Sequence, residues 1–229
     1  MSRARTSVAV HGTPHFCGRR RENRDTLSFL GLVHNGLGWH LNPAYGGWGG
    51  RYVLYQPYGE TRPIWTNNHD SRDTVTADNG QQVCSDPATI WRWREHFQHD
   101  FAARMDWCAA AELQGANHNP IAVLNGDATK RVLRLNVVAG DTLRLSAAGS
   151  SDPDGHRVTC RWFVYREAGT FQGEVALSAA EGETTSFVAP QVAKPATIHV
   201  IQQLEDDGHP KLFAYRRAIV SLAARELLP

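Results

Sequence analysis

The second half of the chain alternates apolar and polar residues in short runs, and this alternation constrains the fold more than any other feature of the sequence. Turn-forming residues separate the runs at nearly regular intervals, which is typical of a β-sandwich. The runs are residues 121–126, 131–138, 142–149, 158–165, 173–178, 184–190, 196–206 and 212–224. Residues 158–165 suit the central strand, with Trp162 as core anchor. We predict a sandwich of about seven strands from residue 119 onward.

Two acidic turns interrupt this β half, at residues 150–155 (SSDPDG) and 205–208 (EDDG). The tetrapeptide from Asp152 to Gly155 matches a type I turn, with proline second and glycine fourth. A calcium clip between strands is the alternative, but the sequence lacks a complete EF-hand loop. We favour the plain turn, because local backbone bonding explains aspartates at such positions.

Residues 26–111 have a different pattern. Asp86 and Pro87 open the strongest helical pattern, since aspartate can cap free amides and proline suits the first helical position. Residues 27–33 form an apolar run that suits a buried strand, although periodicity alone does not separate it from a helix. The helix is expected to dock through an apolar stripe. The stripe consists of Ile90, Trp93, Phe97, Phe101, Met105 and Cys108. One helix and one or two strands cannot cover each other, so we expect the tail of a larger α/β domain whose other units lie upstream.

A stretch rich in glycine and aromatic residues holds the candidate ligand-binding residues. Trp48 stands between two glycine pairs, which suits either a sugar-stacking ring or a core ring admitted by small neighbours, and both interpretations stay open. Neighbouring amides and carboxylates can bind vicinal hydroxyls, although they also favour solvated turns. The candidate residues are Trp48, Gly47, Gly49, Arg51, Asn67, Asn68 and Asp70.

No catalytic residue can be assigned from the sequence. Glu60 and Asp70 could act as acid and base of a glycosidase, but that chemistry depends on the separation of the carboxylates. His96 and His99 are spaced for a metal on a helix, yet they lack a third-ligand motif, and we expect solvated histidines and no metal. The spacing of the four cysteines matches neither a zinc knuckle nor a redox motif, so we expect incidental thiols.

The charge balance excludes several partner classes. With 24 basic and 23 acidic residues, the net charge of +1 gives no nucleic-acid footprint. No run is long and apolar enough to span a membrane, so we expect no membrane partner. Residues 1–25 are rich in arginine, and their apolar run at 8–10 is too short for a signal-peptide core. We expect this segment to be disordered or non-homologous.

Four segments together resemble known families. Residues 149–165 (GSSDPDGHRVTCRWFVY) resemble the polycystic-kidney-disease-type, immunoglobulin-like modules found beside many polysaccharide enzymes. Residues 29–74, 88–107 and 117–127 resemble a bacterial family of cellulose-binding proteins, in which a nucleoside-hydrolase-like domain precedes a C-terminal β-sandwich. The resemblance extends over about residues 26–224.

The resemblance implies an α+β chain in two parts. Residues 26–111 would be the truncated, C-terminal part of an α/β nucleoside-hydrolase-like domain, and residues 112–118 a linker. Residues 119–229 would be the all-β immunoglobulin-like sandwich. The resemblance also implies a secreted or periplasmic protein, although no signal peptide is visible in the sequence. The oligomeric state stays open.

The resemblance further implies binding of a polysaccharide, cellulose or a related β-glucan, or of a small sugar-containing ligand. The alternative is a hydrolase of glycosyl or N-glycosyl bonds whose catalytic aspartate cluster lies upstream. Nucleoside hydrolases hold calcium with a DxDxxxDD cluster, which this sequence lacks. We therefore expect no cofactor in this chain, calcium only in a complete hydrolase-like domain, and no activity from this chain alone. His69 and Asp70 are the candidate for the late His-Asp pair of such enzymes.

Overall fold

The computed structural model describes residues 28–67, 71–77, 79–112 and 115–223. We call residues 28–112 the N-terminal part and residues 115–223 the β part. The N-terminal part contains η2 (Ser28–Leu32), η3 (Pro43–Tyr45), β1 (Val53–Leu54), β2 (Trp65–Thr66), β3 (Asp73–Thr76), β4 (Gln82–Ser85), α1 (Ala88–Trp91) and α2 (Arg94–Ala109). The β part contains β5 (Leu133–Val138), β6 (Thr142–Ser146), β7 (Val158–Val164), η5 (Arg166–Ala168), β8 (Thr184–Val188), β9 (Ala196–Asp206) and β10 (Phe213–Ala223).

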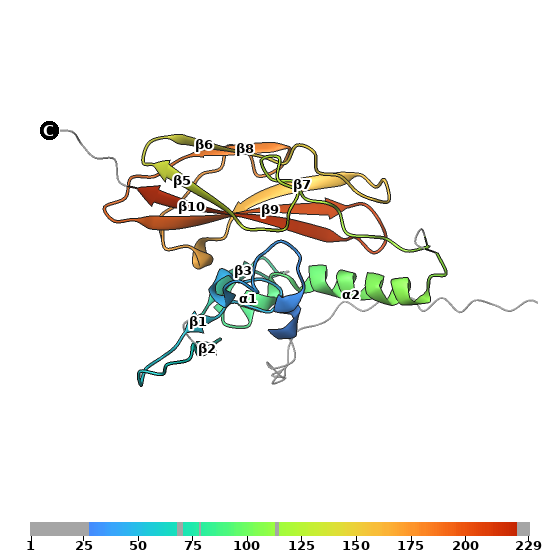
Figure 1. Ribbon diagram of the computed structural model, residues 1–229, viewed down its shortest axis with the longest axis horizontal. Coiled ribbons are helices and arrows are strands. Elements are labelled where there is room, and N and C mark those ends of the chain that lie inside the picture. The colour runs from blue at the N-terminus through green and yellow to red at the C-terminus, as the bar shows by residue number, and fades with distance from the viewer. Residues whose placement is uncertain (1–27, 68–70, 78, 113–114, 224–229) are drawn as a thin grey trace, which may run out of the picture.

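The β part has two layers of strands (Figure 1). One is a four-stranded sheet in the order β5-β10-β9-β7, in which β5 and β10 are parallel and the other pairs antiparallel. The other layer pairs β6 with β8. Buried side chains from both layers meet between them, including Leu145, Trp162 and Phe187. The predicted β-rich half is confirmed, but residues 173–178 form no strand and residues 121–126 contain only isolated bridges. The prediction of a central strand at residues 158–165 is wrong, because β7 lies at the edge of its sheet.

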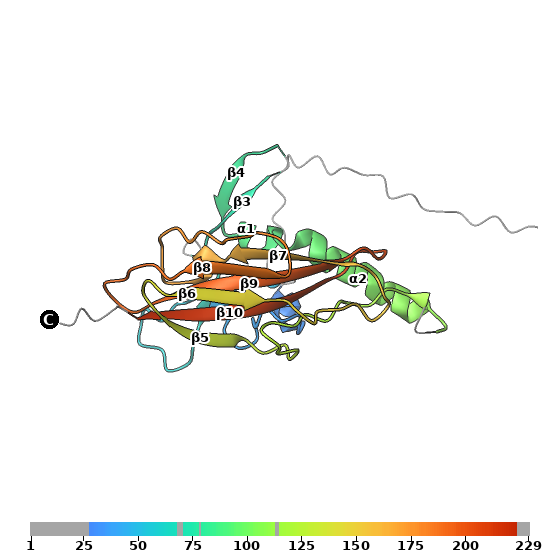
Figure 2. The ribbon, with the colours of Figure 1, turned by 90° about the horizontal axis from the view of Figure 1, so that it is seen from above.

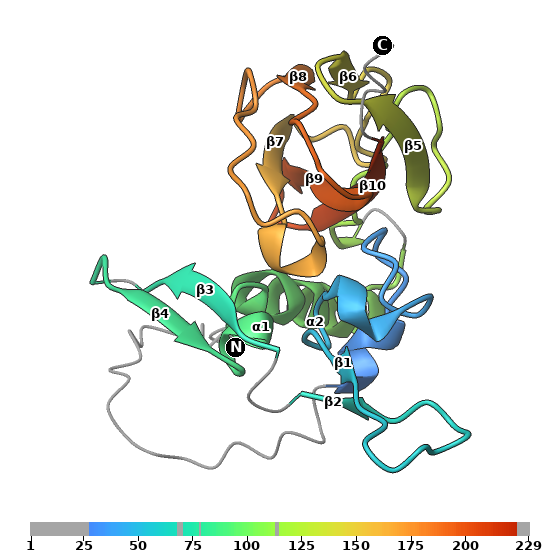
Figure 3. The same cartoon turned by 90° about the vertical axis from the view of Figure 1, so that its left-hand side faces the viewer.

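Strands β9 and β10 are buried along most of their length on both faces. One face packs against the β6–β8 layer, and the other lies over the N-terminal part (Figures 1 and 3). Figure 2 shows the β6–β8 layer lying across the larger sheet, with β3 and β4 projecting beyond its edge. Coverage on both sides fits the mostly apolar sequence of β10, whose two arginines, Arg216 and Arg217, are buried and hydrogen-bonded.

The prediction of a buried strand at residues 27–33 is wrong. The described part of this run is the 3-10 helix η2, and Phe29 and Leu32 are 58% and 68% exposed. The amide of Val33 donates to the carbonyl of Leu30 at 3.2 Å, so the turn satisfies its backbone locally. Gly31 packs directly under the Trp39 ring, where any side chain would collide with the indole.

The predicted single helix is two helices, α1 and α2, with a break at Arg92 and Trp93. At the start of α1 the carbonyl of Asp86 accepts from the amide of Thr89 at 3.1 Å. The break shifts the phase of the apolar stripe, so Trp93 is buried while Phe101 is 63% exposed. None of the helices formed by the described residues is long and apolar enough to cross a membrane.

Exposed apolar surface is concentrated in the N-terminal part. Ten of the thirteen large apolar side chains that are exposed among the described residues lie there, which matches the expectation that this segment is incompletely covered. They are Phe29, Leu32, Leu41, Leu54, Tyr55, Tyr58, Ile64, Trp91, Phe101 and Met105.

The two parts share one buried cluster of aromatic and aliphatic side chains. Trp93 and Trp48 of the N-terminal part pack edge-on against Tyr215 of β10, with ring centroids 5.5 and 6.2 Å apart. The other buried members are Leu37, Tyr165, Ile201 and Phe213. The predicted domain boundaries stay a prediction, but the core of the N-terminal part is completed by side chains of the β part.

A buried ion-pair network reinforces this junction. The carboxylate of Asp73, fully buried, accepts from Arg51 Nε at 2.8 Å and Arg92 Nη1 at 3.0 Å. It also accepts from the Tyr165 hydroxyl at 2.6 Å. Burial is the main cause that raises the pKa of Tyr165, and the Asp73 charge adds to it, so the phenol stays a donor. The Arg92 guanidinium lies 4.2 Å from the Tyr165 ring centroid, in cation–π geometry.

A second buried cation, Arg217 of β10, reaches into the N-terminal loops. Its guanidinium donates to the carbonyls of Leu37 at 2.7 Å and Gly46 at 2.9 Å. A third hydrogen bond, at 2.9 Å, joins Arg217 Nη1 to His199 Nδ1, which must be unprotonated to accept it. Burial, with a smaller contribution from the Arg217 charge, lowers the pKa of His199 to about 3.

We predict that Phe97→Ala lowers the free energy of unfolding by about 2 kcal/mol. Phe97 packs against the shared cluster but is only partly buried, so the loss should fall below the roughly 3–5 kcal/mol of a fully buried phenylalanine. Phe101→Ala is the matched control, one turn away on α2 and mostly exposed. Urea unfolding of both variants measures the difference. Equal losses would contradict a core that extends across both parts.

We predict that stability falls as the pH drops from 6.5 to 4. The pKa values of His199 and His96 are lowered by burial from 6.5 to about 3 and about 4, so in this range the unfolded chain binds more protons than the folded one. His199→Gln, which cannot titrate, should give a shallower slope of unfolding free energy against pH. His209→Gln removes an exposed imidazole and is the control. Identical slopes for wild type and His199→Gln would refute the assignment.

Candidate functional site

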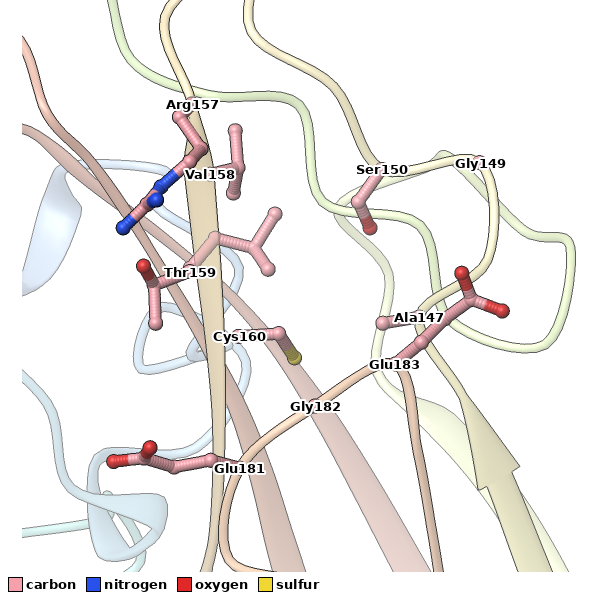
Figure 4. Close-up of a pocket in the computed structure, with 11 residues that line it drawn as sticks. Ala147, Gly149, Ser150, Arg157, Val158, Thr159, Cys160, Glu181, Gly182 and Glu183 are labelled. Atoms are coloured by element: carbon pink, nitrogen blue, oxygen red, sulfur yellow. The ribbon is translucent and has the colours of Figure 1, made fainter.

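A cleft of about 470 Å³ opens beside β7, at the edge of the four-stranded sheet (Figure 4). Its walls come from the residues after β6, the first half of β7 and the loop before β8. That loop is held against β7 by hydrogen bonds from Trp162 N to Ala180 O at 2.7 Å and from Gly182 N to Cys160 O at 3.0 Å. The lining residues are Ala147, Gly149, Ser150, Arg157, Val158, Thr159, Cys160, Glu181, Gly182, Glu183 and Leu204.

The cleft presents exposed groups that can exchange hydrogen bonds with a polyol. Glu181 and Glu183 supply acceptors, and Arg157 supplies donors. In Figure 4 the Glu183 carboxylate extends toward Gly149. Glu181 lies 3.6 Å from Arg161, but both side chains are more than half exposed, so this ion pair contributes little. Both carboxylates are therefore accessible to a ligand.

Two nucleophile-type side chains of the cleft, Cys160 and Ser150, are not activated. Burial raises the pKa of the Cys160 thiol to about 12, which disfavours the reactive thiolate. The Ser150 hydroxyl is committed to Val123, accepting from its amide at 3.0 Å and donating to its carbonyl at 3.3 Å. This arrangement suits reversible binding better than covalent chemistry.

The structure favours the core interpretation of Trp48. Its indole is 1% exposed and donates to the Tyr215 hydroxyl at 3.3 Å, so it has no free face for a sugar. The flanking glycines serve close packing. A Cβ added at Gly49 would lie 2.8 Å from backbone atoms of Ser28 and Gly31. A Cβ added at Gly47 would contact the side chains of Trp39 and Leu37. The alternative, in which Trp48 is an exposed sugar-stacking ring, is therefore wrong.

Of the remaining candidate residues of the N-terminal part, the structure describes the side chains of Arg51 and Asn67, and both are engaged within the protein. Arg51 is 7% exposed and bound to Asp73, and its Nη2 also donates to the Arg72 carbonyl at 2.7 Å. Asn67 Nδ2 lies 3.4 Å from Thr89 Oγ1. Asn68, His69 and Asp70 lie outside the described residues.

The glycosidase pair of Glu60 and Asp70 stays a prediction, and the expectation that His96 is solvated is wrong. Asp70, the partner of Glu60, is outside the described residues, and a Glu60 oxygen accepts from the Tyr58 amide at 3.1 Å. His96 stacks on Phe213 with centroids 3.8 Å apart and hydrogen-bonds to the Tyr215 hydroxyl.

Exposed aromatic rings do occur on the loop that joins β1 to β2. Tyr55 and Tyr58 are 50% and 89% exposed. The loop is braced by Gln56 Nε2, which donates to the carbonyls of Glu60 at 2.8 Å and Arg62 at 3.0 Å. This tyrosine loop therefore offers ring surface of the kind that we expected from Trp48.

Sequence reasoning missed the cleft. The motif Glu181-Gly182-Glu183 was a usable signal, because a glycine between two acids, set between β runs, indicates an exposed acidic turn. Gly182 has a φ of 108°, a conformation that L-residues with side chains rarely adopt. The opposite wall of the cleft, at residues 147–150, is distant in the sequence and is brought next to this motif only by the fold.

The β part matches a family of known proteins. Residues 142–222 match the family model described as the C-terminal domain of the cellulose-binding protein Sde0182. The matched stretch begins at β6 and includes every residue that lines the cleft. The expected resemblance to cellulose-binding proteins is confirmed for these residues.

Solved structures extend the similarity. A nucleoside hydrolase-related hypothetical protein from Saccharophagus degradans, described as associated with carbohydrate metabolism, is 33% identical over 85% of this chain, with a TM-score of 0.71. This chain covers 46% of that protein, less than half of its length. The PKD domain from KIAA 1837 protein is 16% identical, covering 43% of this chain and 87% of its own, with a TM-score of 0.30 that is too low to support an argument. No curated protein matches. The chain is thus similar, through its β part, to the C-terminal domain of a cellulose-binding protein, and over most of its length to a carbohydrate-associated protein.

Proposed function

We propose that this chain binds cellulose or a related β-glucan, and that the cleft beside β7 is the binding site. The proposal rests on one observation above the others: all of the cleft's lining residues lie within the stretch that matches the cellulose-binding C-terminal domain. Its volume is in the range of small-ligand sites, which suits a short length of a sugar chain.

The chemistry of the cleft supports the choice of a neutral polyol. Carboxylates and guanidinium groups bind pairs of hydroxyls through paired hydrogen bonds, and Glu181, Glu183 and Arg157 are exposed for this purpose. The half-buried side chain of Val158 gives the cleft an apolar surface against which ring carbons can pack. The tyrosine loop, Tyr55 to Tyr58, is a second contact surface, on which amphipathic rings can stack.

The same proposal includes the finer fold and location. We take the two layers of the β part as an immunoglobulin-like sandwich, and the N-terminal part as the C-terminal portion of a nucleoside-hydrolase-like domain. Two observations support this: the 33% identity to the nucleoside hydrolase-related protein, and the uncovered apolar surface of the N-terminal part. A glucan ligand implies a secreted or periplasmic site of action.

We predict that the double variant Glu181→Gln/Glu183→Gln reduces retention on insoluble cellulose by at least roughly tenfold, because a hydrogen bond to a charged group has a net contribution of about 1.5–3 kcal/mol and about 1.4 kcal/mol corresponds to a factor of ten. Glu174→Gln, an exposed acid outside the cleft, is the matched control and should bind like wild type. Depletion binding to cellulose measures all three proteins, and thermal melts confirm that they are folded.

The outcome also separates the two surfaces. Loss of retention in Tyr58→Ala alone would move the site to the tyrosine loop. Equal retention by the double variant and its control would refute the cleft, and no retention by wild type would refute glucan binding.

The alternative, a hydrolase of glycosyl or N-glycosyl bonds, leads to a separate prediction. We expect no calcium-dependent release of base from inosine or uridine by this chain. Calcium needs six or more oxygen ligands. Three aspartates lie close together in the sequence of the N-terminal part, Asp70, Asp73 and Asp78. Asp73 has both oxygens occupied by Arg51, Arg92 and Tyr165. Asp70 and Asp78 lie outside the described residues. Chromatography of the nucleoside with and without calcium decides, and calcium-dependent release would establish the hydrolase.

A further inference from the structure

The turn between β6 and β7 brings three potential metal ligands together. One ligand atom each of Asp152, Asp154 and His156 lies within 4.8 Å of the others. The predicted turn is formed, with Gly155 N donating to Asp152 O at 3.3 Å. Asp152 Oδ1 also accepts from the amides of Asp154 at 2.9 Å and His156 at 3.1 Å. These backbone contacts orient the Asp152 side chain and satisfy the hydrogen-bonding capacity of Oδ1, one of its two carboxylate oxygens.

The other oxygen is not explained by the turn. The side chain of Asp152 is 0% exposed, yet its Oδ2 has no hydrogen-bond partner among the described residues. The same holds for the buried Nδ1 of His156. Buried polar atoms are normally satisfied, since leaving them unpaired disfavours folding. Two unsatisfied atoms, one from a carboxylate and one from an imidazole, occur here within a single turn.

The spacing of these groups fits coordination better than hydrogen bonding. His156 Nδ1 lies 3.6 Å from Asp152 Oδ1, which is too long for a hydrogen bond. Two ligands at about 2.1 Å from one zinc ion, at the tetrahedral angle, are separated by roughly 3.4 Å. A cation bound between Asp152 Oδ1 and His156 Nδ1 would satisfy the imidazole nitrogen that the protein leaves unpaired.

The linker supports the third ligand from outside. The amide of His118 donates to Asp154 Oδ2 at 2.6 Å, and its Nδ1 lies 3.0 Å from Asp154 Oδ1. The His118 ring is itself stacked on Trp107 of α2, with centroids 5.5 Å apart. A histidine that orients a ligating carboxylate is a common outer-shell contact of metal sites.

Negative charge is concentrated around this turn. Asp206 of β9 has its pKa raised mainly by burial and further by the charge of Asp152. Its oxygens accept from Asn117 Nδ2 at 3.1 Å and from the amides of Gly208 and Leu212. Among the ion pairs of the described residues, Asp152 is paired only with His156. A bound cation would therefore offset a local excess of carboxylates.

We propose that Asp152, Asp154 and His156 bind a divalent transition-metal ion of the zinc class, which ties the turn between β6 and β7 to the linker. The imidazole selects this class over calcium, which takes an all-oxygen shell of six or more ligands. Water completes the coordination. This site is separate from the cleft and does not depend on glucan binding.

The test is Zn²⁺ binding by the full chain, stripped with a chelator and followed by calorimetry and thermal melts. Wild type should bind one equivalent tightly and melt at a higher temperature with the ion. Asp152→Asn and His156→Gln should weaken that equivalent on the order of 100-fold or more, since even outer-shell changes cost about 10–100-fold. The matched controls are Asp141→Asn, an exposed turn acid, and His209→Gln, an exposed histidine, and both should bind like wild type.

Each result has a definite reading. Asp152→Asn retains an acceptor for the turn amides, and His156→Gln leaves the turn carboxylates intact, so at least one folded variant is expected. The same tight equivalent in wild type and both variants would place zinc elsewhere, for example on other histidines of the chain, and would overturn the proposal. Binding of Ca²⁺ rather than Zn²⁺ that is lost in the same variants would overturn the assignment to the zinc class.

Discussion

The attachment of the N-terminal part to the β part depends on one buried carboxylate, that of Asp73. It is shared between Arg51 and Arg92 of its own part and the hydroxyl of Tyr165, which follows β7. A buried charge is tolerated only when it is paired and hydrogen-bonded, and loss of one partner leaves the others uncompensated. Asp73 therefore fixes which face of the N-terminal part meets the sheet. The aromatic cluster around Trp93 can pack only in that arrangement.

The sequence predicted the β part well because its information is local. Alternation and turn residues located β5 to β10 within a few residues, since each strand is amphipathic or continuously apolar on its own. The N-terminal part was predicted less well because its structure depends on distant partners. The apolar stripe of the helix assumed one unbroken phase. The helix breaks at Trp93, and the buried Asp100 carboxylate accepts hydrogen bonds from Arg104 and Asn119. With Asp100 facing inward, Phe101 faces outward.

The candidate site shows the same limit. A tryptophan between glycines has the same local sequence whether its ring is displayed or buried, and the contact that decides is with Tyr215, 167 residues away. The cleft was missed for a related reason, because the Glu181 loop and the Gly149 turn become neighbours only when β7 is the edge of its sheet. Local chemistry identifies residues that can bind a ligand, and long-range packing decides which of them are free to do so.

The acidic side chains that stabilise the fold are paired with arginines, whereas those that can bind a ligand are not. Asp73 has two arginines, and Asp100 is held by Arg104 at 2.6 Å, so both are occupied by the fold. The side chain of Asp152, by contrast, is fully buried and accepts from backbone amides, and Glu183 is exposed at the rim of the cleft. A buried carboxylate without a neighbouring basic side chain points to a bound metal ion. An exposed carboxylate without such a neighbour is suited to bind the hydroxyl groups of a ligand. Acidic side chains therefore have three roles in this chain. The neighbours of each carboxylate in the fold, rather than its local sequence, determine its role.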